Sequence, residues 1–291
     1  MDNPFKSWTQ TPQDPSGKSD RTAWTCEKCG TTYKGVDIPN AFVPGGRIVI
    51  PPPEIGDCLL CREAEHTAFM EEQARREAKR TSDLFLKWSA TGADYLRCSL
   101  DNFNPVRGTL GALENVKTYL DTFSEPDGRW LLLFGPPGSG KTHLGMALRN
   151  EIERRHACLA IAITLPYLMA ELRASWNRQP GEDADGRSED WIMGKLQVAK
   201  FVLIDDLMEF KDWAAERLFV LIDSRYRNRK KLVFTSNHTP EELEQILGPR
   251  LWSRFAARTT MVRVSAPDYR QTVERKRVNR PMQSPEEAPD A

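Results

Sequence analysis

Residues 135–142 form a glycine-rich segment, GPPGSGKT, whose residue types and spacing are suited to binding phosphate groups. Glycines let the backbone turn tightly, so that its N–H groups surround phosphate oxygens, and a following helix adds the positive end of its dipole. Lys141 is placed to contact the β- and γ-phosphates, and Thr142 to bind Mg²⁺. An apolar segment precedes the glycines and a helix-forming segment follows them, which disfavours a chance glycine-rich turn. The residues expected to contact a nucleotide are Gly135, Pro136, Pro137, Gly138, Ser139, Gly140, Lys141, Thr142 and His143.

Polar residues end two later apolar segments of the chain. Asp205 and Asp206 follow FVLI, and Asn237 ends KLVFTSN. We expect Asp205 to belong to the nucleotide site and to hold Mg²⁺ through water. Asp206 is expected to orient the attacking water or accept its proton, and Asn237 to position that water beside the γ-phosphate. For Asp205 and Asp206 the structural alternatives are a helix N-cap or a structural acid pair. For Asn237 the alternative is ordinary Ser-Asn turn chemistry.

Three arginines, Arg250, Arg254 and Arg258, recur at four-residue spacing and therefore share one side of a helix. They lie far beyond the glycine-rich segment in the sequence. One interpretation is a solvated basic face, which contributes little to stability. The other is that one of these arginines contacts a nucleotide that is bound to a different molecule.

Four cysteines form two Cys-x-x-Cys pairs, Cys26/Cys29 and Cys58/Cys61, with 28 residues between the pairs. Each pair presents two thiolates to one tetrahedral ion, so the two pairs predict a structural Zn²⁺ site without an open coordination position. The intervening VPGGRIVIPPP is expected to form a hairpin or loop, and the flanking chain is too short to build a core without metal. The alternatives are redox-active or uncoordinated thiols, and replacement of one ligand by His66.

Five short apolar segments are suited to form the sheet that these candidate residues need. The segments alternate with helix-forming stretches, which is typical of a parallel sheet covered on both faces. They are RWLLLF (129–134), CLAIAIT (158–164), KFVLIDD (200–206), KLVFTSN (231–237) and TMVRV (260–264). The sequence therefore predicts an α/β fold, arranged as a three-layer sandwich.

Composition changes along the chain predict five parts. They are a disordered tail at 1–22, a zinc-binding module at 23–61, a helical linker at 62–94, an ATPase domain at 95–280 and a disordered tail at 281–291. Residues 62–88 lack Gly and Pro, and Thr81–Asp83 is a candidate break in the helix expected there. Residues 180–190 are polar and are expected to form a mobile loop.

The formal net charge is zero, so affinity for nucleic acid must come from local charge. RYRNRKK (225–231) carries five positive charges, and residues 250–280 carry nine Lys or Arg residues against two acidic residues. These segments predict a salt-dependent path for DNA, with a solvated positive edge as the alternative. No apolar run is long enough to span a membrane and no secretory leader is recognisable, so the cytoplasm is the expected compartment.

The order of these motifs resembles that of AAA+ ATPases, and in more detail that of the DnaC/DnaI/IstB group of bacterial helicase loaders and transposition helper ATPases. The matching segments are SLDNFNP (99–105), GPPGSGKTHLGMAL (135–148), VLIDDL (202–207), RLFVLIDSRY (217–226), FTSN (234–237), RLWSRF (250–255) and DYR (268–270). The resemblance implies ATP and Mg²⁺ as ligands. It also implies that Arg254, in the SRF-like element, acts in trans as an arginine finger on the ATP of a neighbouring subunit. Too few residues follow Arg270 for a full C-terminal lid, so Arg270 is expected to replace the lid's sensing arginine in part.

Some helicase loaders of this group have a zinc-containing N-terminal domain that holds the replicative helicase, whereas IstB-like transposition ATPases generally lack one. The resemblance therefore implies an ATP-dependent loader, bacterial or from a phage, that assembles into a homo-oligomer. Such a protein binds single-stranded DNA and delivers a hexameric DnaB-type helicase in DNA replication. Two alternatives remain: a transposition helper that binds duplex DNA and a transposase, and a non-catalytic adaptor that uses ATP as a switch.

Overall fold

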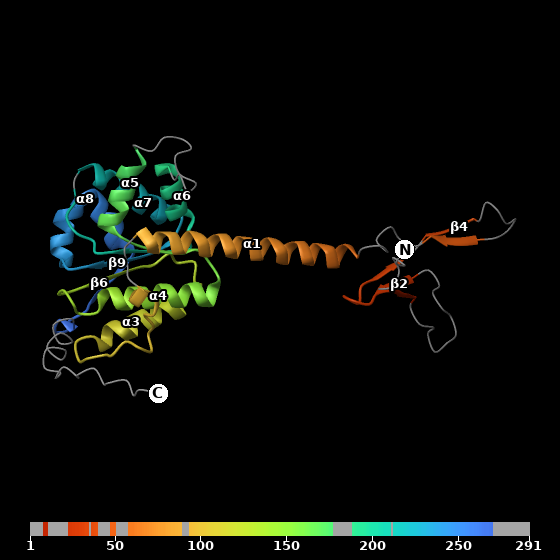
Figure 1. Ribbon diagram of the computed structural model, residues 1–291, viewed down its shortest axis with the longest axis horizontal. Helices are drawn as coiled ribbons and strands as arrows, with labels where there is room; N and C mark the ends of the chain where they lie inside the picture. Colours follow the sequence, from red (N-terminus) through yellow and green to blue (C-terminus); the bar gives the residue numbers. More distant parts are fainter. Residues whose placement is uncertain are drawn as a thin grey trace, which may run out of the picture. The chain divides into compact units, whose positions relative to one another are not determined.

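The chain divides into two compact units, Met1–Ala74 and Arg75–Ala291, and the boundary falls within helix α1 (Leu59–Trp88). Figure 1 labels several elements of both units. The computed structural model describes residues 8–10, 23–34, 36–39, 47–50, 58–88, 93–176, 188–210 and 212–269. In this part of the chain, none of the helices combines the length and apolarity needed to cross a membrane.

The first unit is built from short antiparallel strands. β1 (Trp8–Gln10), β2 (Ala23–Cys26) and β3 (Thr32–Lys34) form one sheet in that order. β4 (Val36–Pro39) pairs with β5 (Arg47–Ile50) in a separate hairpin, as expected for the chain between the two cysteine pairs.

Strand β1 corrects one expectation from the sequence. It lies within residues 1–22, which were expected to be a disordered tail, and the rest of that segment is outside the described residues. The backbone of residues 8–10 pairs with one edge of β2. The tail expected at 281–291 and most of the loop expected at 180–190 also lie outside the described residues.

The second unit contains a parallel sheet formed by all five predicted segments. Its strands are β6 (Trp130–Phe134), β7 (Ala160–Thr164), β8 (Phe201–Asp205), β9 (Lys231–Ser236) and β10 (Thr259–Arg263). They are arranged in the order β10-β6-β9-β8-β7, and every neighbouring pair is parallel. The α/β sheet predicted from the sequence is therefore confirmed.

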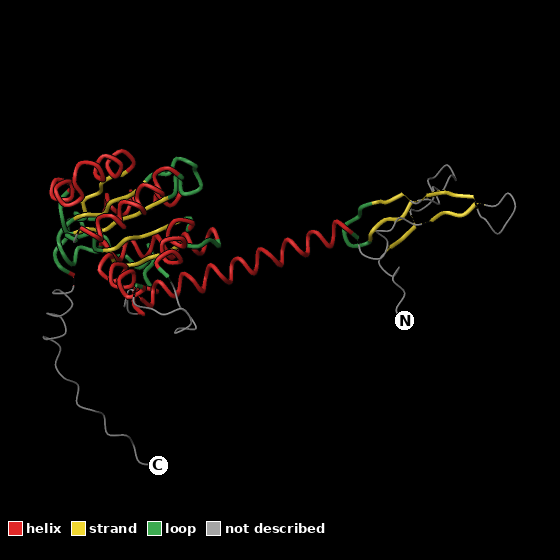
Figure 2. Tube along the Cα trace, turned by 90° about the horizontal axis from the view of Figure 1, so that it is seen from above, coloured by secondary structure: helices red, strands yellow, loops and turns green. Residues whose placement is uncertain are grey.

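Helices cover both faces of this sheet. Figure 1 shows α3 and α4 on one face and α5, α6, α7 and α8 on the other, and Figure 2 shows the strands between the helices from another direction. Helix α8 bends at Gly248, where φ is 70°. The helices of this unit, besides the end of α1, are α2 (Ala93–Leu96), α3 (Leu110–Asp121), α4 (Lys141–His156), α5 (Leu165–Ser175), α6 (Glu189–Val198), α7 (Asp212–Arg227) and α8 (Pro240–Arg258).

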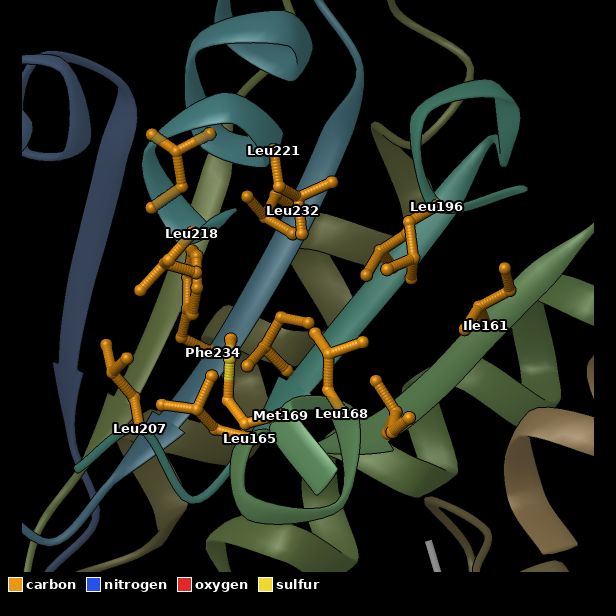
Figure 3. Packing of buried hydrophobic residues seen from close by; sticks show 14 of the residues in the cluster. Ile161, Leu165, Leu168, Met169, Leu196, Leu207, Leu218, Leu221, Leu232 and Phe234 are labelled. Carbon is orange, nitrogen blue, oxygen red and sulfur yellow. The ribbon is translucent and has the colours of Figure 1, made fainter. Parts of the chain in front are cut away.

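Two apolar cores result, one on each face of the sheet. In β6, Leu131 and Leu133 pack with the core on the α3–α4 side, whereas Trp130 and Leu132 pack with the opposite core. Figure 3 shows the latter core, where side chains of β7 and β9 meet Leu168 of α5 and other residues of α5, α6 and α7. Successive residues of each strand point to opposite faces of the sheet. Because both faces are buried, both sets of residues are apolar, which explains the continuous apolar runs in the sequence.

Helix α1 runs without a break through Thr81–Asp83, although this sequence was a candidate break. Ser82 is buried, and its hydroxyl donates a hydrogen bond to the carbonyl oxygen of Ala160 at 2.6 Å. Further along the helix, the ring of Phe85 stacks on the ring of Trp191. The polar residues at 81–83 therefore continue the helix because the fold supplies a partner for the buried hydroxyl.

The basic segment 225–231 is only partly available to DNA. Arg225 is fully buried and donates hydrogen bonds to three carbonyl oxygens, those of Leu196 (2.5 Å), Ala199 (3.1 Å) and Lys231. The ammonium group of Lys231, also buried, lies 2.6 Å from a carboxylate oxygen of Asp127. The prediction of a DNA path over the whole segment is therefore wrong for Arg225 and Lys231, whose charges hold helix and strand ends together.

Arg225→Met is expected to lower the free energy of unfolding by about 3 kcal/mol, because three buried carbonyl oxygens lose this donor. Burial lowers the pKa of Arg225 to about 9, so the guanidinium is still charged at neutral pH. Urea unfolding of the full-length protein measures the change. Arg229→Met, at an exposed position two residues beyond α7, is the control. Equal stability of the two variants would contradict the prediction.

Candidate nucleotide site and metal centre

A cleft of about 720 Å³ opens at the carboxyl ends of the strands in the second unit. Strand β6 comes first along the chain in this sheet but lies between β9 and β10, so the chain changes direction across the sheet after it. Ligands of open α/β sheets bind at the carboxyl ends of the strands beside such a change of direction. The volume lies in the range of small-molecule sites. Most lining residues come from the glycine-rich segment, the ends of β8 and β9, residues 102–109 and residues 266–269, and Tyr95 and Thr164 complete the lining.

The glycine-rich segment connects β6 to α4 in a conformation that needs glycine. Gly138 has φ of +72°, and a Cβ there would lie 1.9 Å from a carboxylate oxygen of Asp268. The φ of Gly135 is +149°, and its Cβ would lie 2.2 Å from the carbonyl oxygen of Val264. The glycines therefore let residues 264–268 approach the loop closely.

Two polar side chains of this segment fit an anionic ligand. The ammonium group of Lys141 donates to the carbonyl oxygens of Gly135 and Pro136, both at 2.8 Å, and its side chain is buried. Ser139 is also buried, and within the described part of the chain its hydroxyl has no hydrogen-bond partner. A buried polar group without a partner is costly, and a phosphate oxygen would satisfy it. Lys141 and Ser139 therefore fit the phosphate groups of a nucleoside triphosphate.

The acidic end of β8 lies beside the start of α4. The hydroxyl of Thr142 donates to the carboxylate of Asp205 at 3.0 Å, and the hydroxyl of Thr235 donates to it at 2.5 Å. Burial raises the pKa of Asp205, and these two hydrogen bonds oppose the rise. A hydroxyl and a carboxylate are oxygen ligands of the kind that Mg²⁺ prefers, so Thr142 and Asp205 are suited to hold the ion.

Asp206 and Asn237 are brought together as the sequence predicted. The side-chain amide of Asn237 donates to a carboxylate oxygen of Asp206 at 3.3 Å, and both residues line the cleft. Asp206 has φ of 59°, a left-handed conformation that turns the chain away from the sheet after β8. This geometry places a carboxylate and an amide where they can orient a water molecule.

Thr235 is a functional candidate that the sequence analysis did not single out. Its hydroxyl donates to Asp205 and accepts a hydrogen bond from the backbone N–H of Asp206 at 2.9 Å. It therefore orients both acidic residues from the neighbouring strand. The available signal was a threonine two residues before Asn237, in an otherwise apolar strand.

Thr235→Val is expected to lower ATPase activity by about 10- to 100-fold, the usual effect of losing a partner that orients metal ligands. The substitution keeps the shape of the side chain but removes both hydrogen bonds. A titration of ATPase activity with Mg²⁺ measures the effect, because weaker metal binding moves the curve to higher concentration. Thr260→Val, exposed on β10, is the matched control. An unchanged Mg²⁺ curve would show that Thr235 does not orient the acidic residues.

The segment SLDNFNP also contributes to the site. The Nε2 atom of His143 lies 2.9 Å from the amide oxygen of Asn102 and 3.2 Å from the carbonyl oxygen of Ser99. The ring of Phe103 packs on His143 and lies so close to Gly140 that a Cβ there would be 2.8 Å from it. His143 therefore lines the cleft while it holds this segment against the phosphate loop.

Arg254 lies away from the cleft of its own chain. It is not among the described residues that line the cleft, and it faces α7 instead. Its Nε atom donates to a carboxylate oxygen of Asp223 at 2.8 Å. Arg250 lies over the ring of Phe219 (4.5 Å), and the third arginine of the series also packs on α7. The shared helix face is confirmed, but it packs on α7 and is not a freely solvated face. Arg270 lies outside the described residues.

The four cysteines of the first unit converge, as their spacing predicted. The Sγ atoms of Cys26, Cys29, Cys58 and Cys61 all lie within 4.8 Å of one another. Two of the Sγ–Sγ distances are 3.8 Å (Cys26–Cys61) and 3.5 Å (Cys29–Cys58). Zn–S bonds of about 2.3 Å in tetrahedral geometry place sulfurs about 3.8 Å apart, so the cluster fits Zn²⁺. His66 is exposed on α1 and is not part of the cluster.

Comparisons with known proteins agree with this geometry. A family model described as IstB-like ATP binding protein matches residues 121–276. The replicative helicase loader DnaC of Escherichia coli (strain K12) is 25% identical over 207 residues, which cover 69% of this chain and 80% of that protein.

Solved structures show the same fold. The crystal structure of the DnaC helicase loader has a TM-score of 0.53 at 22% identity, covering 60% of this chain and 100% of that chain. The crystal structure of DnaI has a TM-score of 0.51 at 19% identity, covering 60% of this chain and 95% of that chain. The predicted three-layer phosphate-loop fold is therefore confirmed.

Proposed function

The chain belongs to the IstB-like ATP-binding protein family, and we propose that it is an ATP-dependent loader of a replicative helicase. The observation that carries the proposal is the match with the replicative helicase loader DnaC, which includes 80% of that protein. The four-Cys cluster supports the same choice, since the transposition ATPases of the wider group generally lack one. The AAA+ fold and the ATP-binding family support ATP hydrolysis as the source of work.

The proposed roles of the site residues follow from their positions. Lys141 contacts the β- and γ-phosphates, and Thr142 and Asp205 hold Mg²⁺, which neutralises phosphate charge. Asp206 and Asn237 orient the attacking water. The remaining residues of the phosphate loop bind the nucleotide through their backbone N–H groups.

Arg254 is proposed to act in trans, on the ATP of a neighbouring copy. Its position outside its own cleft supports this role, because the residue cannot serve the site of its own chain from there. Hydrolysis then depends on assembly of a homo-oligomer. In this proposal Arg270 contributes to nucleotide sensing.

The proposed partners are a hexameric replicative helicase and single-stranded DNA. Two neighbouring large apolar side chains of α1, Phe69 and Met70, are 59% and 53% exposed, which suits a contact with the helicase beside the zinc module. Arg229 and Arg263 are exposed and are suited to contact DNA phosphates. The compartment proposed for these partners is the cytoplasm.

A transposition helper is the second candidate, because the family model that matches residues 121–276 is described as IstB-like. Such a protein would bind duplex DNA in an ATP-dependent manner and would not contact the helicase. Tight ATP binding without turnover in the assembled protein would instead favour an adaptor that uses ATP as a switch.

The test mixes the purified full-length protein with the hexameric helicase of its own host and circular single-stranded DNA. We expect a helicase complex in size-exclusion chromatography and transfer of the helicase to the DNA, measured by unwinding. A double variant with Phe69→Ser and Met70→Ser should lose the complex, whereas Glu71→Ser, exposed on the side of the same helix that faces away from this pair, should retain it. Failure of the unaltered protein to capture the helicase, together with ATP-dependent duplex binding, would overturn the loader in favour of the transposition helper.

A further inference from the structure

Helix α7 holds the side chain of Arg254 through one carboxylate. Asp223 accepts a hydrogen bond from Nε of Arg254 at 2.8 Å through one oxygen. Its other oxygen lies 2.9 Å from Nε of Arg227, one turn further along α7. The Asp223 side chain is only 15% exposed, so this carboxylate is directed at the two guanidinium groups and not into solvent.

Further contacts restrict the direction of the Arg254 guanidinium group. Its Nη1 atom donates to the carbonyl oxygen of Arg250 at 3.2 Å, and the ring of Phe219 lies 5.3 Å from its central carbon. A guanidinium carries five N–H donors in a rigid plane, so fixing Nε and Nη1 fixes the direction of Nη2 as well. None of these contacts uses the two hydrogens of Nη2.

We propose that Asp223 is a positioning residue for the trans-acting arginine: it holds Arg254 so that Nη2 is directed at the triphosphate bound to a neighbouring copy. This inference rests on the trans role of Arg254 proposed above. Asp223 also pairs with Arg227, so its single negative charge is shared and the arginine face remains positive overall. A positive, pre-oriented donor is what stabilises charge on a transferring phosphoryl group, because no reorganisation is needed when the reaction occurs.

A merely structural role for the same pair predicts something different. The Arg254 side chain is 29% exposed, and ion pairs that are partly exposed contribute little to stability. If Asp223 only joined α7 to α8, its loss would change ATPase activity little. The change would also be the same in a subunit that supplies Arg254 and in a subunit that binds the ATP.

The experiment separates the two tasks by mixing subunits. Subunits with Lys141→Ala serve as donors, which supply Arg254 but do not bind ATP productively. Acceptors carry Arg254→Ala, and they bind ATP but supply no arginine. Neither should hydrolyse ATP alone, and the full-length mixture, assembled on single-stranded DNA, should recover activity. Asp223→Ala is then added to the donor in one mixture and to the acceptor in another.

We expect Asp223→Ala to lower kcat of the mixture by about 100-fold in the donor, the usual effect of displacing a catalytic group by about 1 Å, with KM for ATP unchanged. In the acceptor it should have no effect, which also excludes misfolding as the cause. Asp223→Asn in the donor should recover most of the activity, because its amide oxygen still accepts from Nε. Glu216→Ala, at an exposed acid on α7, is the control and should be neutral in either subunit.

The outcomes distinguish this inference from the function on which it rests. If the starting mixture recovers no activity, the trans role of Arg254 fails and the role of Asp223 fails with it. If the mixture is active but Asp223→Ala is neutral in the donor, or equally harmful in both subunits, only the positioning role is overturned. Failure of Asp223→Asn to exceed Asp223→Ala would overturn it too.

Discussion

Arg254→Ala is expected to lower the ATPase turnover of the assembled protein by about 10³-fold while ATP binding is retained. In the proposed mechanism, a guanidinium from a neighbouring copy stabilises the charge that develops on the γ-phosphate, and alanine removes this guanidinium. ATP binding is retained because Arg254 is not among the described residues that line its own cleft. Turnover on single-stranded DNA and binding of a fluorescent ATP analogue measure the two effects separately.

Two further variants sharpen this prediction. Arg254→Lys keeps the positive charge but lacks the Nε hydrogen that Asp223 accepts, so it should restore little activity. Arg250→Ala removes a neighbouring arginine that lies over the same ring of Phe219 and should reduce turnover far less. Full activity of Arg254→Ala in the assembled protein would rule out the trans role. Loss of ATP binding would instead point to a role within the same chain.

The sheet and the phosphate loop could be predicted from the sequence because local patterns determine both. A parallel sheet with two buried faces requires continuous apolar strands, and these are visible in a single sequence. The loop between β6 and α4 requires glycine where the backbone has positive φ, as at Gly138, so its spacing is recognisable. Asp205 and Asn237 were recognised because they end such strands.

Other features depend on contacts between distant residues, which sequence patterns do not contain. The positive charges of residues 225–231 indicated a DNA path. Arg225, however, is fully buried and donates hydrogen bonds to carbonyl oxygens in α6 and at the C-terminal end of α6. In the sequence Thr235 is an ordinary strand residue, and its role depends on the packing of β8, which places Asp205 next to its hydroxyl. The partnership of Asp223 with Arg254 likewise exists only because α7 and α8 pack together. Each is a polar contact whose partner is supplied by the tertiary fold.

Removal of zinc is expected to unfold the first unit while the second unit keeps its ability to bind ATP. Among the described residues of the first unit, the buried apolar cluster consists of Cys26 and Cys58, with Trp24, Tyr33 and Cys61 packed against them. Three of these five residues belong to the four-cysteine cluster that fits Zn²⁺, so the candidate metal site forms most of this core. Structural zinc in small domains contributes about 10–16 kcal/mol, far more than such a cluster supplies without metal.

Cys58→Ser tests this expectation. The zinc content should fall from one ion per chain to none, and limited proteolysis should degrade the first unit while the fragment from about residue 75 remains and binds ATP. His66→Ala is the matched control, because His66 is exposed on α1 outside the cluster and should leave the zinc content unchanged. Retention of a full zinc complement by Cys58→Ser would exclude the four-thiolate site. Loss of zinc from His66→Ala would make the histidine a ligand. If Cys58→Ser lost ATP binding together with zinc, the phosphate site would depend on the metal. The separate cores of the two units do not support such a coupling.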